Sequence, residues 1–245
     1  FYLLQNAGDT DSTVRVRYLR PTGAPVEKTY TVRAGSRATI WVDFEQFPDG
    51  SGNRALADTD VSAVIDVLSG PAIIAERAMY LTPAGSTVLY EAGHESAGVL
   101  APATTWFLAE GATGDYFDTF VLLANPSGTD AEVRATYLLP DGSTLSKTYT
   151  VRANSRFNIW LDYEEFDGVA GRPLADTAVS TTVESLNGVG VIVERAMWWP
   201  GPTPATWAEA HNSPGSTVTA TRWGLAEGVV DGAPTLTETF FLLAN

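Results

Sequence analysis

The chain contains no cysteine among its 245 residues. This absence excludes disulfides, thiolate metal sites and cysteine nucleophiles together. Basic residues are also few, since 15 Lys and Arg stand against 29 Asp and Glu and leave a net charge of −14. An acidic surface repels phosphate backbones and anionic lipid headgroups. No basic run or stripe interrupts this acidity, so the sequence predicts a protein that does not bind nucleic acid.

Long apolar runs are missing as well. No stretch approaches the roughly 18 residues of a membrane-spanning helix, so we expect no insertion into a membrane. The hydrophobic content of 44% is nevertheless high enough to bury cores, which argues against general disorder. The chain begins inside a strand-like phrase, without an initiator Met or a signal peptide. This predicts a mature or excised piece of a longer protein.

A tandem repeat dominates what is present. The phrase TYTVRA begins at Thr29 and again at Thr148, 119 residues later. The phrase WxLAEG begins at Trp106 and again at Trp223, 117 residues later. Single-residue deletions in loops explain the small drift. A unit of about 117 residues is long enough for an independent sandwich domain.

The repeat predicts three segments. Residues 1–105 form a first unit that lacks its opening WxLAEG strand. Residues 106–222 form a complete second unit, which we expect to fold on its own. Residues 223–245 hold the opening strands of a third unit.

Local patterns are those of β-strands throughout. In AEVRATYLL, residues Val133, Ala135 and Tyr137 alternate with polar neighbours, and LPDGS at residues 139–143 is a Pro-Asp-Gly turn. Extended helix patterns are absent. About seven or eight short strands per unit favour an all-β fold of tandem antiparallel β-sandwich domains of immunoglobulin-like class, with a barrel as the alternative.

Several phrases together resemble a repeat found in tandem in large secreted bacterial surface proteins. They are WFLAEGATGDYFDTFVLLANP, TYLLPDGS, YTVRANSR, ADTAVSTTVES and VERAMWW. The resemblance spans nearly the whole chain and implies β-rich modules at an extracellular or cell-surface location. That family is one of unknown function, so the resemblance supplies no catalytic residues.

The two histidines, His94 and His211, occupy equivalent positions of the repeat. One histidine per unit makes no multi-histidine metal site unless the copies meet across units. We therefore expect hydrogen-bonding roles, equivalent surroundings and no metal. Nucleophile and phosphate-loop signatures are missing, and the acidic clusters from Asp9 and from Phe47 lack the calcium-loop pattern. The sequence predicts no enzyme, no catalytic residue, no cofactor and no metal site.

The ERAM phrase places one arginine among apolar neighbours in each unit, at Arg77 and Arg195. A partly buried arginine needs a carboxylate or several carbonyls around it. A glycan or carboxylate-ligand site is the functional interpretation, and an ion pair within each unit is the structural one. Recurrence favours the ion pair, because every copy must rebuild the fold. The preferred partners are Asp58 and Asp176, and the alternates are Asp43 and Asp162.

Two tryptophans, Trp41 and Trp160, lie out of phase with the apolar face of their predicted strands. Aromatic rings at such positions stack on the apolar faces of sugars, which makes both residues candidate glycan contacts. Packing and contacts between domains are the default interpretation for large aromatic side chains.

The leading functional prediction is a non-catalytic structural module of an extracellular bacterial filament, stalk or surface layer. Its partners are copies of itself. The alternatives are an adhesin or carbohydrate-binding array, with surface glycans as partners, and a spacer beside a secreted enzyme.

A unit without its opening strand exposes unpaired edges, which the orphan strand of a third unit would fill. We therefore expect an open edge or groove beside residues 1–6, and a segment 223–241 that extends away from the second unit. Such a head-to-tail contact propagates, either between copies or along one polyprotein. The predicted assembly interface comprises Phe1, Tyr2, Leu3, Leu4, Trp223, Leu225, Phe240 and Phe241.

Overall fold

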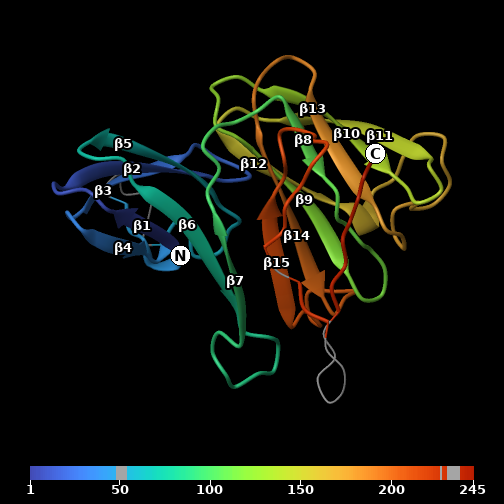
Figure 1. Cartoon of the computed structure of the whole chain (residues 1–245), viewed down its shortest axis with the longest axis horizontal. Coiled ribbons are helices and arrows are strands. Elements are labelled where there is room, and N and C mark those ends of the chain that lie inside the picture. Colours follow the sequence, from blue (N-terminus) through green and yellow to red (C-terminus); the bar gives the residue numbers. More distant parts are fainter. Residues whose placement is uncertain (48–53, 227, 231–237) are drawn as a thin grey trace.

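The computed structural model describes residues 1–47, 54–226, 228–230 and 238–245 (Figure 1). Their secondary structure is strands, loops and two three-residue 3-10 turns, η1 (Val42–Phe44) and η2 (Leu161–Tyr163). Every strand pairing is antiparallel, and the strands form four sheets. The predicted all-β antiparallel fold is confirmed. In this part of the chain no helix has the length and apolar character needed to span a bilayer.

Two sheets are built from the first repeat unit. One has the strand order β4-β1-β6-β7 and the other β3-β2-β5. The strands are β1 (Tyr2–Asn6), β2 (Ser12–Leu19), β3 (Val26–Val32), β4 (Ser36–Ile40), β5 (Ser62–Ser69), β6 (Ile74–Leu81) and β7 (Ala92–Ala97).

The other two sheets are built from the second unit. One has the order β12-β9-β14-β15 and the other β11-β10-β13-β8. The strands are β8 (Thr105–Leu108), β9 (Asp118–Asn125), β10 (Ala131–Leu138), β11 (Thr144–Val151), β12 (Ser155–Trp160), β13 (Ser180–Ser185), β14 (Ile192–Trp199) and β15 (Glu209–Pro214).

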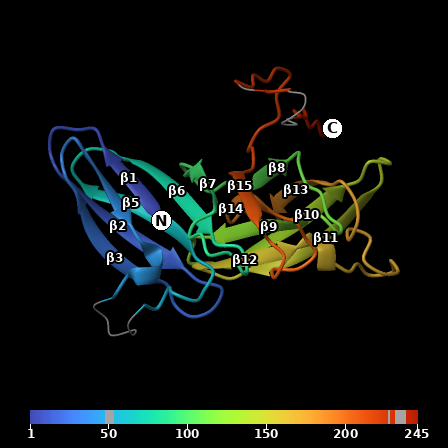
Figure 2. The ribbon, with the colours of Figure 1, turned by 90° about the horizontal axis from the view of Figure 1, so that it is seen from below.

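Each pair of sheets encloses its own hydrophobic core, one drawn from residues 2–75 and the other from residues 99–193 (Figure 2). Alternation along the strands explains the packing. In β10, Val133, Ala135 and Tyr137 are fully buried while Arg134 faces solvent, as the sequence predicts. The β-sandwich prediction is confirmed in place of the barrel. The immunoglobulin-like class and the domain boundaries stay predictions.

The repeated phrases LLQN and LLAN end on a buried asparagine for a physical reason. Asn125 Nδ2 donates to the carbonyls of Thr129 at 2.8 Å and Val151 at 2.9 Å. Asn6 Nδ2 makes the equivalent bonds to Thr10 and Val32. A buried amide costs free energy unless its hydrogen bonds are made, so this asparagine fixes the turn that follows the strand in both units.

The two units differ at one sheet edge. In the second unit β8 pairs with β13, and Trp106 lies opposite Val183. Trp106 is only 1% exposed, and its Nε1 donates to the Val191 carbonyl at 2.8 Å. This side chain therefore closes the core where the two sheets meet.

The change Trp106→Ala removes that closure, because it leaves a large cavity and takes away one of the two hydrogen bonds that the Val191 carbonyl accepts. We expect the free energy of unfolding of the second unit, measured in the full chain, to fall by about 3–5 kcal/mol. Urea titration followed by far-UV circular dichroism measures the loss. Trp223→Ala is the matched control at the equivalent repeat position, where the ring is 62% exposed, and it should change stability little. Equal losses in the two variants would contradict this role for Trp106.

Candidate functional site

Strand β5 of the first unit lies at the edge of its sheet, whereas its equivalent in the second unit, β13, is paired on both sides. β5 pairs with β2 and ends its three-stranded sheet, and the described residues supply no second neighbour. Val183, Val191 and Val193 of the second unit are almost completely buried. Their repeat equivalents in the first unit are only partly buried, namely Ile65, Ile73 and Ala75. The first core is therefore uncovered at the place that Trp106 covers in the second.

The predicted open edge beside residues 1–6 is wrong. β1 lies inside its sheet, with Tyr2 opposite Ile40 on one side and Arg77 on the other. A shallow hollow of about 450 Å³ does lie over Leu3, on a face of the sheet and not at its edge. The reason is topological, since the missing WxLAEG strand belongs to the opposite sheet, beside β5.

The C-terminal segment presents apolar side chains to solvent. Trp223 is 62% exposed and Leu225 is 70% exposed, and Phe240 and Phe241 are exposed as well. The described residues of 217–245 form no strand, so the opening strands predicted for a third unit are not formed here. Figure 2 shows this segment standing away from the sheets of the second unit, as predicted. Residues 227 and 231–237 of this predicted unit lie outside the described residues.

A joint of paired charges connects the two units. β7 lies against β15 (Figure 1). Arg77 Nη1 is 2.7 Å from Glu194 Oε2, and its Nη2 donates to Asn212 Oδ1 at 2.7 Å. The ion pair is mostly buried, so solvent screens it less than an exposed pair.

A second contact fixes the joint from another side. The buried Arg156 of β12 lies 2.8 Å from Asp60, and its Nε donates to Ser62 Oγ at 3.2 Å. Arg17 of β2 donates to Asn154 Oδ1 at 2.6 Å. Two separated contacts restrict rotation of one unit about the other.

The ion pairs predicted inside each unit for the ERAM arginines are wrong. Arg77 reaches the acid of the other unit because β7, the neighbour of β6, lies against β15. Arg195 instead donates to the Glu110 carbonyl at 3.2 Å and to Ser213 Oγ at 2.9 Å. The prediction considered only acidic residues of the same repeat unit. It missed the pair with Glu194 because the contact between the two units is not visible in the sequence. The rejected partners are Asp58 and Asp176, with the alternates Asp43 and Asp162.

The two histidines meet across the joint, with their ring centroids 5.7 Å apart. Burial, assisted by Arg77 and His211, lowers the pKa of His94 to about 4. Burial and Arg195 also lower the pKa of His211, although its side chain is more exposed. Their surroundings thus share a neighbouring arginine but differ in exposure. The described residues contain no cluster of three or more metal-ligating His, Cys, Asp or Glu side chains; of the acidic cluster from Phe47, residues 48–53 lie outside the described part.

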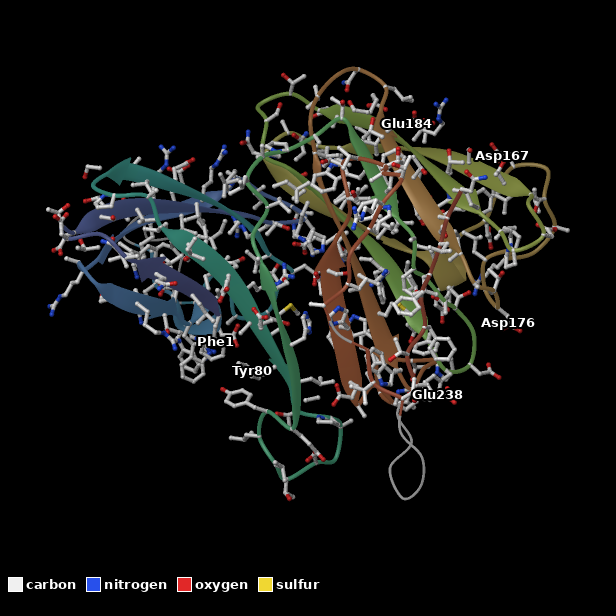
Figure 3. All side chains as sticks on the ribbon, in the orientation of Figure 1. Phe1, Tyr80, Asp167, Asp176, Glu184 and Glu238 are labelled. Atoms are coloured by element: carbon white, nitrogen blue, oxygen red, sulfur yellow. The ribbon has the colours of Figure 1, made fainter. Side chains whose placement is uncertain are left out.

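Each unit carries an aromatic cluster around its candidate glycan tryptophan. In the first unit Trp41, 42% exposed, lies 5.3 Å from Phe1 and 4.3 Å from Phe44 between ring centroids. Figure 3 shows Phe1 and Tyr80 at the same end of this unit, and their ring centroids are 5.7 Å apart. Tyr90 completes the group at 5.3 Å from Tyr80.

The cluster of the second unit is more closed. Trp160 is half-buried, 4.5 Å from Tyr163 and 4.8 Å from Phe120. The buried Asp118 accepts hydrogen bonds from Trp160 Nε1 at 3.2 Å and from Trp207 Nε1 at 2.5 Å. Asp118 thus holds both rings through hydrogen bonds. The repeat comparison did not single it out, because the equivalent position would lie before Phe1 and the first unit has no matching residue.

Asp162 lies beneath this cluster and is 8% exposed. Its Oδ2 accepts from the Thr119 amide at 3.1 Å and its Oδ1 from the Gly114 amide at 3.3 Å. Burial raises the pKa of Asp162 to about 6, against the lowering effect of these two amides.

We predict a pH dependence of stability from this carboxyl. Because its folded pKa is raised, its stabilisation is complete below about pH 4, and up to about 3 kcal/mol is lost as the pH rises through 6. Asp162→Asn should remove that fall when urea unfolding is measured between pH 4 and 7. The control is Asp43→Asn at the exposed equivalent position. Parallel pH profiles for wild type and Asp162→Asn would contradict the assignment.

No protein-family model matches the chain, and neither does any curated protein. Among solved structures, Thermotoga maritima 1070 has 16% identity and a TM-score of 0.39, and the match covers 48% of this chain and 96% of that one. The Anabaena sensory rhodopsin transducer has 21% identity and a TM-score of 0.34, covering 40% of this chain and 91% of its own. Similarity of this degree identifies neither a family nor a function.

Proposed function

We propose that the chain is a non-catalytic structural repeat module of an extracellular bacterial filament, stalk or surface layer. The observation that carries the proposal is the charged joint between the units. Arg77–Glu194 and Arg156–Asp60 hold the second unit at two separated places. A tandem array whose joints are fixed behaves as a rod, whereas freely jointed units behave as a flexible chain.

The joint also explains how Arg77 is accommodated among apolar neighbours. A mostly buried charge is costly unless it is paired and hydrogen-bonded. Arg77 meets both conditions through Glu194 and Asn212 of the neighbouring unit, and it also donates to Ser96 of its own unit. The ion pair therefore specifies one relative orientation. The surface location of the module is supported by the repeat phrases of the sequence.

Copies of the module are its proposed partners. Units join head to tail, either as successive units of one polyprotein or by strand complementation between copies. A contact between two different surfaces of the same protein is heterologous and propagates in one direction instead of closing as a dimer.

The rigid joint is tested by removing its cation. Arg77→Ala leaves the Glu194 carboxylate mostly buried without a partner, which should cost the joint about 3 kcal/mol. We expect small-angle X-ray scattering to show a larger radius of gyration and a broader distribution of distances. Arg134→Ala, which removes an exposed ion pair to Glu184 within the second unit, is the matched control and should leave the curve unchanged. A wild-type curve that already fits freely jointed units would contradict the proposal.

A carbohydrate-binding or adhesin array is the second candidate. The observation in its favour is the exposed cluster of Trp41, Phe44, Tyr80 and Tyr90, which presents several ring faces at one end of the first unit. Sugar rings stack on such faces. The half-buried Trp160 offers a smaller platform in the second unit.

This candidate predicts selective binding on a glycan array. Trp41→Ala should then weaken binding at least tenfold, since it removes the central ring of the exposed cluster. Trp223→Ala, which removes a tryptophan outside the cluster that is more exposed than Trp41, 62% against 42%, is the control and should bind like the wild type. An array without selective binding would rule this candidate out.

A further inference from the structure

We propose that the joint between the two units is a pH-sensitive element, which opens when the histidines that face each other across it take up protons. The inference rests on the rigid joint of the proposed function and adds its regulation. The site lies where β7 of the first unit meets β15 of the second (Figure 1). His94 and His211 are the two histidines of the chain, and their ring centroids are 5.7 Å apart.

The His94 side chain lies on the face of its sheet that turns toward the second unit. The β6–β7 pairing sets Arg77 opposite Ser96. His94 precedes Ser96 by two positions on β7, so it lies on the same face as Arg77. Arg77 binds Glu194 and Asn212 of the second unit from this face. A proton on His94 therefore adds a charge inside the joint.

The closed joint suits the neutral ring of His94. Its Nε2 atom is buried and has no hydrogen-bond partner among the described residues. Protonation at this atom creates an N–H donor and a positive charge with no acceptor to satisfy them. Water can solvate both once the units separate, so protonation favours the open joint.

The closest charges around the two histidines are cationic. Arg77 of β6 acts on His94, and Arg195 of β14 acts on His211. The Glu194 carboxylate of β14 is already paired with Arg77 at 2.7 Å. Each added proton is therefore repelled by an arginine and by the other histidine.

The remaining acidic groups do not offset these cations. Glu95 follows His94 on β7 and so points to the opposite face of the sheet. Glu209 shares the face of His211 on β15 but is exposed, where solvent screens its charge. Glu110 acts on Arg195, which donates to its carbonyl. Protonation of both histidines thus doubles the cations at the joint from two to four and adds no carboxylate.

The direction of the pH effect follows from the pKa values of the histidines. Burial, assisted by Arg77 and His211, lowers the pKa of His94 to about 4, against a hydrogen bond with the Ala210 backbone. The ordinary value in an open joint is about 6.5. The closed joint is therefore fully favoured above pH 6.5 and loses this advantage as the pH falls toward 4. Between pH 7.5 and pH 5 the ratio of open to closed joints should rise at least about tenfold.

The measurement must follow the arrangement of the units and not the stability of the chain. Asp162 titrates in the same range, since burial raises its pKa to about 6. Its partners are the Thr119 and Gly114 amides within the second unit. It stabilises that unit as the pH falls, which is opposite in sign to the effect expected at the joint.

Small-angle X-ray scattering of the full chain at pH 7.5 and pH 5 tests the proposal. We expect the wild type to show a larger radius of gyration and a broader distance distribution at pH 5, with unchanged far-UV circular dichroism. The double variant His94→Gln/His211→Gln cannot take up these protons and should give the same curve at both pH values. An equal change in this control, or a loss of β-structure in the wild type at pH 5, would overturn the proposal.

Two substitutions at His94 separate charge from size at pH 7.5. His94→Arg carries a permanent charge and should open the joint without any change of pH. His94→Met has a long side chain without charge and should keep it closed. Indistinguishable scattering from these two variants would show that charge at this position does not control the joint.

Proton NMR measures the titration itself, because two histidines give two ring C–H signals that the single Gln variants assign. The His94 signal should titrate at least one pH unit below the ordinary value of about 6.5. Titration of both rings near 6.5 would overturn the proposal.

The scattering outcomes distinguish this inference from the proposed function. A wild type with one fixed arrangement at both pH values would overturn the inference and leave the structural-module proposal standing. Freely jointed units already at pH 7.5 would contradict the proposed function and remove this inference with it.

Discussion

The structure of each unit depends on closing one sheet edge with a strand that carries a tryptophan. In the second unit β8 provides this strand, and Trp106 seals the core between the two sheets. In the first unit the same edge, β5, has no such neighbour among the described residues, and the core below it is less buried. An unpaired edge over apolar side chains favours association with another strand. Among the described residues, this is the main difference between two otherwise similar units.

The sequence predicted the strands well because their signals are local. Alternation in β10 correctly placed Val133, Ala135 and Tyr137 in the core, and the repeated phrases fall on equivalent strands in both units. The missing opening strand was also visible in the sequence, as an absent WxLAEG phrase. Its position in the sheet was not, because strand order is set by non-local pairing. The open edge consequently lies at β5 and not beside β1.

The partners of the arginines at the joint were also not predictable from the sequence, because they lie in the other unit. The sequence indicated that Arg77 and Arg195 need partners, which burial requires. It assigned them to aspartates of their own units, yet Arg77 pairs with Glu194 of the other unit and Arg195 uses a backbone carbonyl and a serine. Equivalent residues of a repeat therefore acquire different partners where one copy faces a neighbour. Asp118 was not predicted for a related reason, because it has no counterpart within the first unit. Its role as acceptor for Trp160 and Trp207 depends on contacts between residues distant in sequence.

The open edge of β5 is the central claim, and amide hydrogen–deuterium exchange tests it most directly. In dilute protein, residues 62–69 should exchange much faster than residues 180–185, because β13 is held between two neighbours and β5 by one. Raising the protein concentration should slow exchange in β5 and leave β13 unchanged. Equal protection of the two strands in dilute protein, with no dependence on concentration, would contradict the account.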